Sequence, residues 1–179
     1  MRRYLLRDEE CQLDYTSSSS DDPPIWWRAE KYLREKFDLE KDHGSWYDAR
    51  THEGEKVELK SCQYRYEDGQ IGSFKIWFEQ LTKLFRHDGY IALLVYVPLD
   101  PPSVLATQLL PNYAISTDEA VSFKASHPTM DGKTLVQIPW TEAIPLDAIR
   151  LGCRYEFLKH YSEKECEDTF YFDPPAGSE

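Results

Sequence analysis

The sequence predicts an α/β fold, and three observations carry that prediction. Residues 25–37 and 73–88 repeat apolar side chains at helical spacing. The segment between them reads as two short strands joined by a turn. Residues 90–97, YIALLVYV, are almost continuously apolar, which is typical of a strand that is covered on both faces. Helical and extended segments therefore alternate in the first hundred residues.

The first predicted helix spans residues 25–37. Ile25, Ala29, Leu33 and Phe37 recur every four residues and form one apolar stripe. The preceding SSSSDDPP, residues 17–24, is polar and ends in proline, so residues 1–24 are expected to be a flexible lead-in that supplies the helix start. Glu30 lies beside the apolar stripe.

An antiparallel hairpin is predicted at about residues 45–50 and 56–66. Trp46, Tyr47, Val57 and Leu59 have the apolar and aromatic character of strands. The glycine in THEGE, residues 51–55, favours a tight connection between them.

The second predicted helix spans residues 73–88 and ends at Gly89. Its apolar positions follow the helical rhythm at Phe74, Trp77, Phe78, Leu81, Leu84 and Phe85. Ser73 and Lys75 would then lie at the helix start, where free backbone N–H groups favour phosphate. Lys83 lies further along the polar side, and an ordinary solvated helix face is the alternative interpretation of these residues.

The later part of the chain is less regular. Residues 135–140 read as a strand and residues 145–149 as the start of a short helix. We found no internal repeat. The expected organisation is a flexible segment 1–24, a single domain 25–160 with its core in 25–97, and an acidic tail 161–179.

Composition limits the possible functions. The chain of 179 residues has 32 acidic and 21 basic side chains, a net charge of −11, so a broad basic groove for nucleic acid is not expected. Only residues 60–87 are locally positive, with five basic and three acidic side chains. The longest apolar run, residues 91–97, is too short to span a membrane. Four cysteines without a CxxC pair indicate reduced thiols in a cytoplasmic protein: Cys11, Cys62, Cys153 and Cys166.

The residues that suggest chemistry are Asp48, Glu58 and Lys60. Glu58 and Lys60 are two apart on a predicted strand, so their side chains leave the same face, and the hairpin returns Asp48 towards it. Two neighbouring carboxylates require a cation between them or the protonation of one of them, and their oxygens suit Mg²⁺ or Mn²⁺. A lysine there can orient a water aimed at phosphorus, which is chemistry for phosphodiester hydrolysis. A half-buried strand with a solvated charged face would show the same alternation.

With Gly44, Asp48 and Glu58-Leu59-Lys60, followed by the helical and apolar segments, the sequence resembles the PD-(D/E)xK nuclease superfamily over residues 25–97. The resemblance implies a restriction endonuclease-like, or archaeal Holliday junction resolvase-like, α-β-β-β-α-β core with a central mixed sheet flanked by helices. Tyr47 stands where the family name has proline. The acidic surface disfavours junction resolution.

The resemblance also implies site residues. Asp48 and Glu58 would ligate Mg²⁺ or Mn²⁺, the Leu59 carbonyl would complete the shell, and Lys60 would orient the water. Glu30 is the candidate for an additional glutamate from the first helix, and its alternative role is an ion pair with Arg34 one turn later.

Residues after the lysine are candidates for contacts with nucleic acid. Gln63 is one, although it is equally well explained as a solvent-facing strand residue. The other candidates are Arg65, Ser73, Lys75 and Lys83. The expected function is a metal-dependent DNA endonuclease. A homodimer is compatible with it, because one such site cuts one strand and a cut through both strands needs two. The alternatives are a catalytically silent nuclease-fold module that binds DNA or protein, and an acidic interaction protein.

Overall fold

The computed structural model describes residues 13, 23–98, 102–115, 121–124 and 132–145. Most of the predicted lead-in 1–24, the predicted acidic tail 161–179 and most of the predicted helix 145–149 lie outside the described residues. So do Cys11, Cys153 and Cys166. The remaining cysteine, Cys62, is buried and carries a free thiol, as expected.

A five-stranded mixed sheet forms the centre of the fold, in the order β1-β2-β3-β5-β6. β3 and β5 pair in parallel over seven registered residue pairs, whereas the other pairs are antiparallel. The strands are β1 (Glu40–Lys41), β2 (Ala49–Arg50), β3 (Lys56–Gln63), β5 (Tyr90–Val97) and β6 (Ser103–Pro111). The apolar run 90–97 is therefore an interior strand with β3 and β6 as neighbours, and the mixed α/β sheet of the predicted fold is confirmed.

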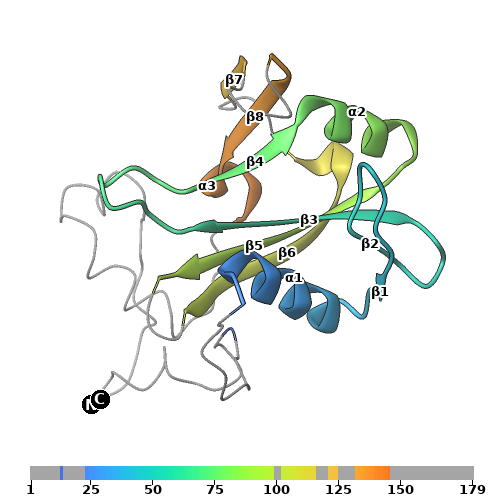
Figure 1. Ribbon diagram of the computed structural model, residues 1–179, viewed down its shortest axis with the longest axis horizontal. Helices are drawn as coiled ribbons and strands as arrows, with labels where there is room; N and C mark the ends of the chain where they lie inside the picture. Colours follow the sequence, from blue (N-terminus) through green and yellow to red (C-terminus); the bar gives the residue numbers. More distant parts are fainter. Residues whose placement is uncertain (1–12, 14–22, 99–101, 116–120, 125–131, 146–179) are drawn as a thin grey trace, which may run out of the picture.

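Helix α1 (Ile25–Lys36) covers one face of this sheet (Figure 1). Ala29 and Leu33 are buried in the middle of the predicted stripe and pack with Val57, Leu59 and Leu94. The helix ends at Lys36, and Asp38 takes a positive φ of 51° where the chain turns towards β1. This short turn leads from the helix into the edge strand β1, while the helix itself packs over β3 and β5.

The predicted helix over residues 73–88 is wrong in its first part. Residues Ser73–Trp77 form strand β4, and helix α2 runs only from Phe78 to Arg86. Phe74 and Ile76 are buried while Lys75 is exposed, which is the alternation of a strand. Ser73 and Lys75 therefore do not lie at a helix N-terminus.

The apolar stripe predicted for this second helix is also partly wrong. Leu84 is buried, but Phe78 and Phe85 are exposed on α2. The buried aromatic side chain is Phe74 of β4 instead, whereas α2 reaches the same core through Leu84.

A second, three-stranded sheet covers the other face of the main sheet, in the order β4-β8-β7. Strand β8 (Thr134–Pro139) confirms the strand predicted at 135–140, and β7 (Val121–Lys124) pairs with it. Trp140 is not part of the strand; it begins the short helix α3 (Trp140–Ala143). Strand β6 and the 3₁₀ turn η3 (Asn112–Ala114) were not predicted.

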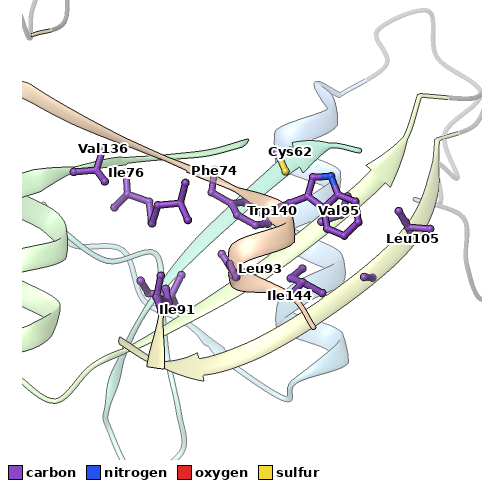
Figure 2. Close-up of a cluster of buried hydrophobic side chains, with 14 of the residues drawn as sticks. Cys62, Phe74, Ile76, Ile91, Leu93, Val95, Leu105, Val136, Trp140 and Ile144 are labelled. Carbon is purple, nitrogen blue, oxygen red and sulfur yellow. The ribbon is translucent and has the colours of Figure 1, made fainter. Parts of the chain in front are cut away.

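Trp140 lies at the centre of the core between the two sheets (Figure 2). Its side chain is fully buried, and its indole N–H donates to the Tyr64 carbonyl at 2.8 Å. Around it lie side chains from both layers, including Cys62, Leu93 and Val95 of the main sheet. This cluster fixes the second sheet against the first. No helix among the described residues has the length and apolarity needed to cross a membrane.

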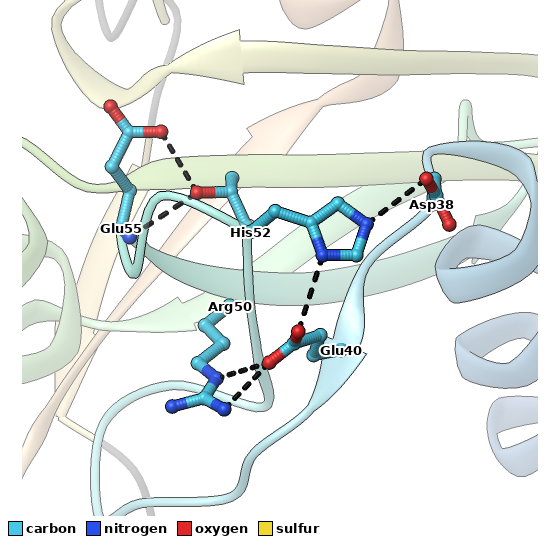
Figure 3. A network of polar contacts seen from close by, with 6 residues as sticks. Asp38, Glu40, Arg50, His52 and Glu55 are labelled. Carbon is cyan, nitrogen blue, oxygen red and sulfur yellow. Dashed lines mark hydrogen bonds and ion pairs between the residues drawn. The ribbon is translucent and has the colours of Figure 1, made fainter.

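Exposed polar contacts hold β1, β2 and the hairpin turn together (Figure 3). Arg50 binds Glu40 through Nε at 2.7 Å and Nη2 at 2.6 Å. His52 lies between Asp38, at 3.0 Å, and Glu40, at 3.2 Å. The hydrogen bond with Asp38, followed by that with Glu40, raises the pKa of His52 above its usual value of 6.5.

We expect Trp140→Ala to lower the free energy of unfolding by about 3–5 kcal/mol, because it removes a large fully buried side chain. Urea unfolding followed by circular dichroism measures the effect. Trp27→Ala is the matched control, since Trp27 is exposed, and should cost less than about 1 kcal/mol. Equal losses in the two variants would contradict the assignment of Trp140 to the core.

We expect the imidazole of His52 to titrate above pH 6.5 in an NMR experiment, and Asp38→Asn to lower that midpoint. A raised pKa contributes stability that is present below pH 6.5 and lost as the pH rises through the folded-state midpoint. Asp42→Asn is the control, because Asp42 pairs with Lys56 instead. A midpoint below 6.5 would show that the two carboxylates do not hold the ring.

Candidate active site

Asp48 is placed opposite Glu58 by the hairpin register. Ala49 pairs with Val57 and the Asp48 N–H donates to the Val57 carbonyl at 2.9 Å, so Asp48 and Glu58 are cross-strand neighbours. One Asp48 oxygen, Oδ2, accepts the Leu59 N–H at 3.2 Å. The other, Oδ1, lies 3.3 Å from Nδ1 of His43. The hairpin thus brings together the two carboxylates that the sequence paired.

Glu58 is a carboxyl group in the interior. Its side chain is 0% exposed. The Lys60 ammonium forms an ion pair with Oε1, and Oε2 has no hydrogen-bond donor within the part of the chain that the structure describes. Burial is the main cause that raises the pKa of Glu58 to about 7, with the neighbouring Asp48 adding to it and Lys60 opposing it. The alternative of a solvated charged face is therefore wrong for Glu58.

Strand β2 leaves β3 early, and this opens the edge of β3 at the site. β2 pairs only with Lys56 and Val57. The next N–H on that edge, from Leu59, points to the Asp48 carboxylate. Because the N–H and C=O of one strand residue point to the same side, the Leu59 carbonyl also faces this open edge. Two carboxylates and one carbonyl group therefore converge at the point where β2 and β3 stop pairing.

A cavity of about 230 Å³ adjoins this edge. Its walls come from Trp26, Ala29, Glu30 and Leu33 of α1 and from residues 59–61 of β3. Glu30 forms the i,i+4 pair with Arg34 at 3.7 Å, and it also lines the cavity with Lys60. Burial, followed by the charge of Asp48, raises the pKa of Glu30. Both roles expected for Glu30 are thus compatible with its position.

The segment before Asp48 is anchored by Lys56. The Lys56 ammonium binds Asp42 at 2.9 Å and lies 4.4 Å from the centroid of the Tyr47 ring. The Gly44 N–H donates to the Tyr47 carbonyl at 2.9 Å, which closes a turn, and a side chain at Gly44 would collide with the Tyr47 ring. These contacts explain why glycine precedes the site and why tyrosine occupies the position before Asp48.

The residues predicted to contact nucleic acid are not gathered at the cavity. Arg65 donates to the Gly69 carbonyl at 2.9 Å and belongs to the turn between β3 and β4. Ser73 is buried on β4, and Lys75 is exposed on the same strand. Lys83 is exposed on α2. Gln63 ends β3, where its side chain hydrogen-bonds to Tyr96. None of the five is among the residues that line the cavity.

The donor set fits a hard divalent ion. Mg²⁺ is commonly held by one or two carboxylates and keeps several waters. The described residues contain no group of three or more His, Cys, Asp or Glu side chains arranged around a metal position, so a set of two carboxylates is what this part of the chain offers. The buried Glu58 oxygen Oε2, which has no hydrogen-bond donor among the described residues, matches that requirement, because a bound cation would supply the missing partner.

A comparison with protein families identifies the domain. Residues 26–144 match the family described as the PD-(D/E)XK nuclease superfamily domain. The chain belongs to this superfamily. Its members are generally nucleases that act with divalent metals on nucleic acid. The match includes the second sheet as well as the core around Asp48 and Glu58, and no curated protein matches the chain.

Two features of this site were not predicted. His43 contacts Asp48, but a histidine five residues before an aspartate gives no distinct sequence signal. The cavity depends on Trp26 of α1 facing the open edge of β3, and that edge exists only because β2 is two residues long. The length of a strand is set by pairing, so the sequence alone does not define the cavity.

We expect the free energy of unfolding of Glu58→Gln, measured relative to that of the wild type without metal, to be more favourable at pH 8 than at pH 5. Glu58 has a folded-state pKa of about 7 against 4.5, so its contribution to stability is fully present below pH 4.5 and lost as the pH rises through 7. The glutamine cannot ionise and escapes this loss, which amounts to at most about 3 kcal/mol.

Urea unfolding of both proteins at pH 5 and pH 8 with a chelator measures the difference. Glu55→Gln, on the exposed hairpin turn, is the control, and its stability should depend on pH in the same way as that of the wild type. Parallel pH dependence of wild type and Glu58→Gln would mean that Glu58 is not forced to ionise in a dry site.

Proposed function

We propose that the protein is a metal-dependent DNA endonuclease that acts through Asp48, Glu58 and Lys60. The observation that carries the proposal is the fully buried Glu58 carboxyl group, which shares its site with a second carboxylate and with a single lysine. Such an arrangement is costly to the fold, because one ammonium group cannot balance two carboxylates and a buried ion pair repays little of its desolvation. Membership of a nuclease superfamily supports the same conclusion.

Asp48, Glu58 and the Leu59 carbonyl are the groups that would hold Mg²⁺ or Mn²⁺. A metal ion in this position supplies Lewis acidity and lowers the pKa of a bound water. Asp48 is positioned for this by its bond to the Leu59 N–H and by His43, since groups that hold a ligand's other atoms fix its orientation. Glu30, on the opposite wall of the cavity, is the candidate for an additional acidic group.

Lys60 is assigned to the attacking water and to the charge that builds on phosphorus. Its side chain is about one quarter exposed, 23%, so it reaches both the interior carboxylate and the cavity. When a cation takes over the charge of Glu58, the Lys60 ammonium no longer has to neutralise that carboxylate. It is then free to donate to the water and to a phosphate oxygen.

Incubation of the purified protein with DNA and Mg²⁺ or Mn²⁺ tests the proposal. The substrates should include plasmid, single-stranded and bulged DNA. We expect metal-dependent cutting, and a loss of at least about 100-fold in rate in both Asp48→Asn and Lys60→Ala. Glu79→Gln and Lys133→Ala are the matched controls, because these two residues form an ion pair with each other outside the site, and they should keep full activity.

Activity that survives in Lys60→Ala would exclude the assigned role of that lysine. If no form of DNA is cut while the protein still binds DNA, the fold serves as a catalytically silent binding module. Metal binding separates these cases further: calorimetry should detect Mn²⁺ binding to the wild type and a weaker interaction with Asp48→Asn.

A further inference from the structure

The cavity beside Lys60 has a composition of its own. Ala29, Leu33 and Leu59 give it apolar walls. Its charged lining residues are one carboxyl group, Glu30, and one ammonium group, Lys60, so the lining carries no positive excess. A phosphate group requires several donors or a net positive charge. The cavity itself is therefore unsuited to a phosphate group. Its apolar walls together with the polar groups of Glu30, Lys60 and Ser61 suit an uncharged, flat ring that has apolar faces and polar edges.

The size and position of the cavity limit the kind of group that it can bind. At about 230 Å³ it is smaller than the sites of drug-sized ligands, which occupy ~300–1,000 Å³. A single ring system fits this volume better than a whole nucleotide. Because Lys60 belongs to both the cavity and the ion pair with Glu58, the cavity opens directly beside the proposed cleavage site.

Trp26 supplies an aromatic surface in this cavity. It lines the cavity although 57% of its surface is exposed. A large indole is usually buried, and tryptophan that is both exposed and part of a cavity is typical of binding surfaces. Bases stack on such rings in proteins that bind single strands. Trp27, the next residue on α1, is also exposed but does not line the cavity.

The distribution of charge disfavours binding to an intact duplex. A protein that follows duplex DNA needs many lysine and arginine contacts with phosphates. This chain has a net charge of −11, and Lys75, Lys83 and Arg86 lie on β4 and α2, elements that do not line the cavity. On α1, which does line it, Arg34 pairs with Glu30 and Lys31 with Glu35. Affinity that comes from stacking a base needs fewer phosphate contacts and is compatible with an acidic surface.

We propose that this cavity receives the base of an unpaired nucleotide next to the scissile phosphate, with Trp26 stacking on that base. The inference rests on the proposed nuclease function and specifies its substrate class. The preferred DNA has a single-stranded segment or a bulge, because a base paired within a continuous duplex cannot enter a cavity in the protein without leaving its stack.

Binding can be measured without cleavage, with Ca²⁺ in place of Mg²⁺ and fluorescently labelled DNA followed by anisotropy. The probes are a duplex, the same duplex with one bulged nucleotide, and that bulge with an abasic residue. We expect the bulged duplex to bind more tightly than the other two. Loss of one stacked base should weaken binding about 5- to 100-fold.

Trp26→Ala should remove the preference for the bulged base, whereas Trp26→Phe should keep most of it and Trp27→Ala all of it. Circular dichroism must show that each variant is folded. Equal binding of the base-containing and abasic bulges by the wild type, or an unchanged preference in Trp26→Ala, would overturn the inference.

The cleavage assay distinguishes a failure of the nuclease proposal from a failure of the base-binding proposal. A wild type that cuts duplex and bulged DNA equally well, with no effect of Trp26→Ala, keeps the proposed nuclease function and rejects the role of the cavity. A wild type that cuts nothing but prefers the bulged base rejects the nuclease function and keeps the base-binding site. The two proposals therefore fail on different observations.

Discussion

The parallel pairing of β3 with β5 is the constraint on which the rest of the structure depends. Seven registered pairs place β3 in the interior of a layered domain, between α1 on one face and the second sheet on the other. The middle of β3, from Val57 to Leu59, is thereby removed from water. Glu58 lies opposite Ile91 in this register, so the fold itself forces a carboxyl group into an apolar environment, whereas Lys60, opposite Leu93, stays partly exposed.

The sequence predicted the elements that follow from local pattern. Four features could be predicted because each depends on residues close together in the chain. They are the helix at 25–37, the hairpin, the buried strand at 90–97 and the convergence of Asp48 with Glu58. The apolar run 90–97 was the strongest signal, since every residue in Ile91–Val97 is buried.

The error at residues 73–77 has a definite physical cause. Phe74, Trp77 and Phe78 fit a helical stripe, whereas Phe74 and Ile76 fit a strand, so the local pattern is compatible with both. Pairing with β8, about sixty residues later, decides for the strand. The lysine that was assigned to a helix start is consequently on a sheet. The open edge of β3 could not be predicted for the same reason, because it depends on where β2 stops pairing.

The opposition between stability and chemistry at Glu58 connects these features. A buried, ionised carboxylate costs the domain free energy near neutral pH, and the ion pair with Lys60 offsets only part of that cost. The same cost is what would give a divalent cation its affinity, because a cation that neutralises Glu58 relieves it. In an acidic chain this matters more than usual. Few basic side chains are available near the site to attract a nucleic acid, so binding would depend on the neutralised carboxylates and on the uncharged contact that Trp26 offers in the adjoining cavity.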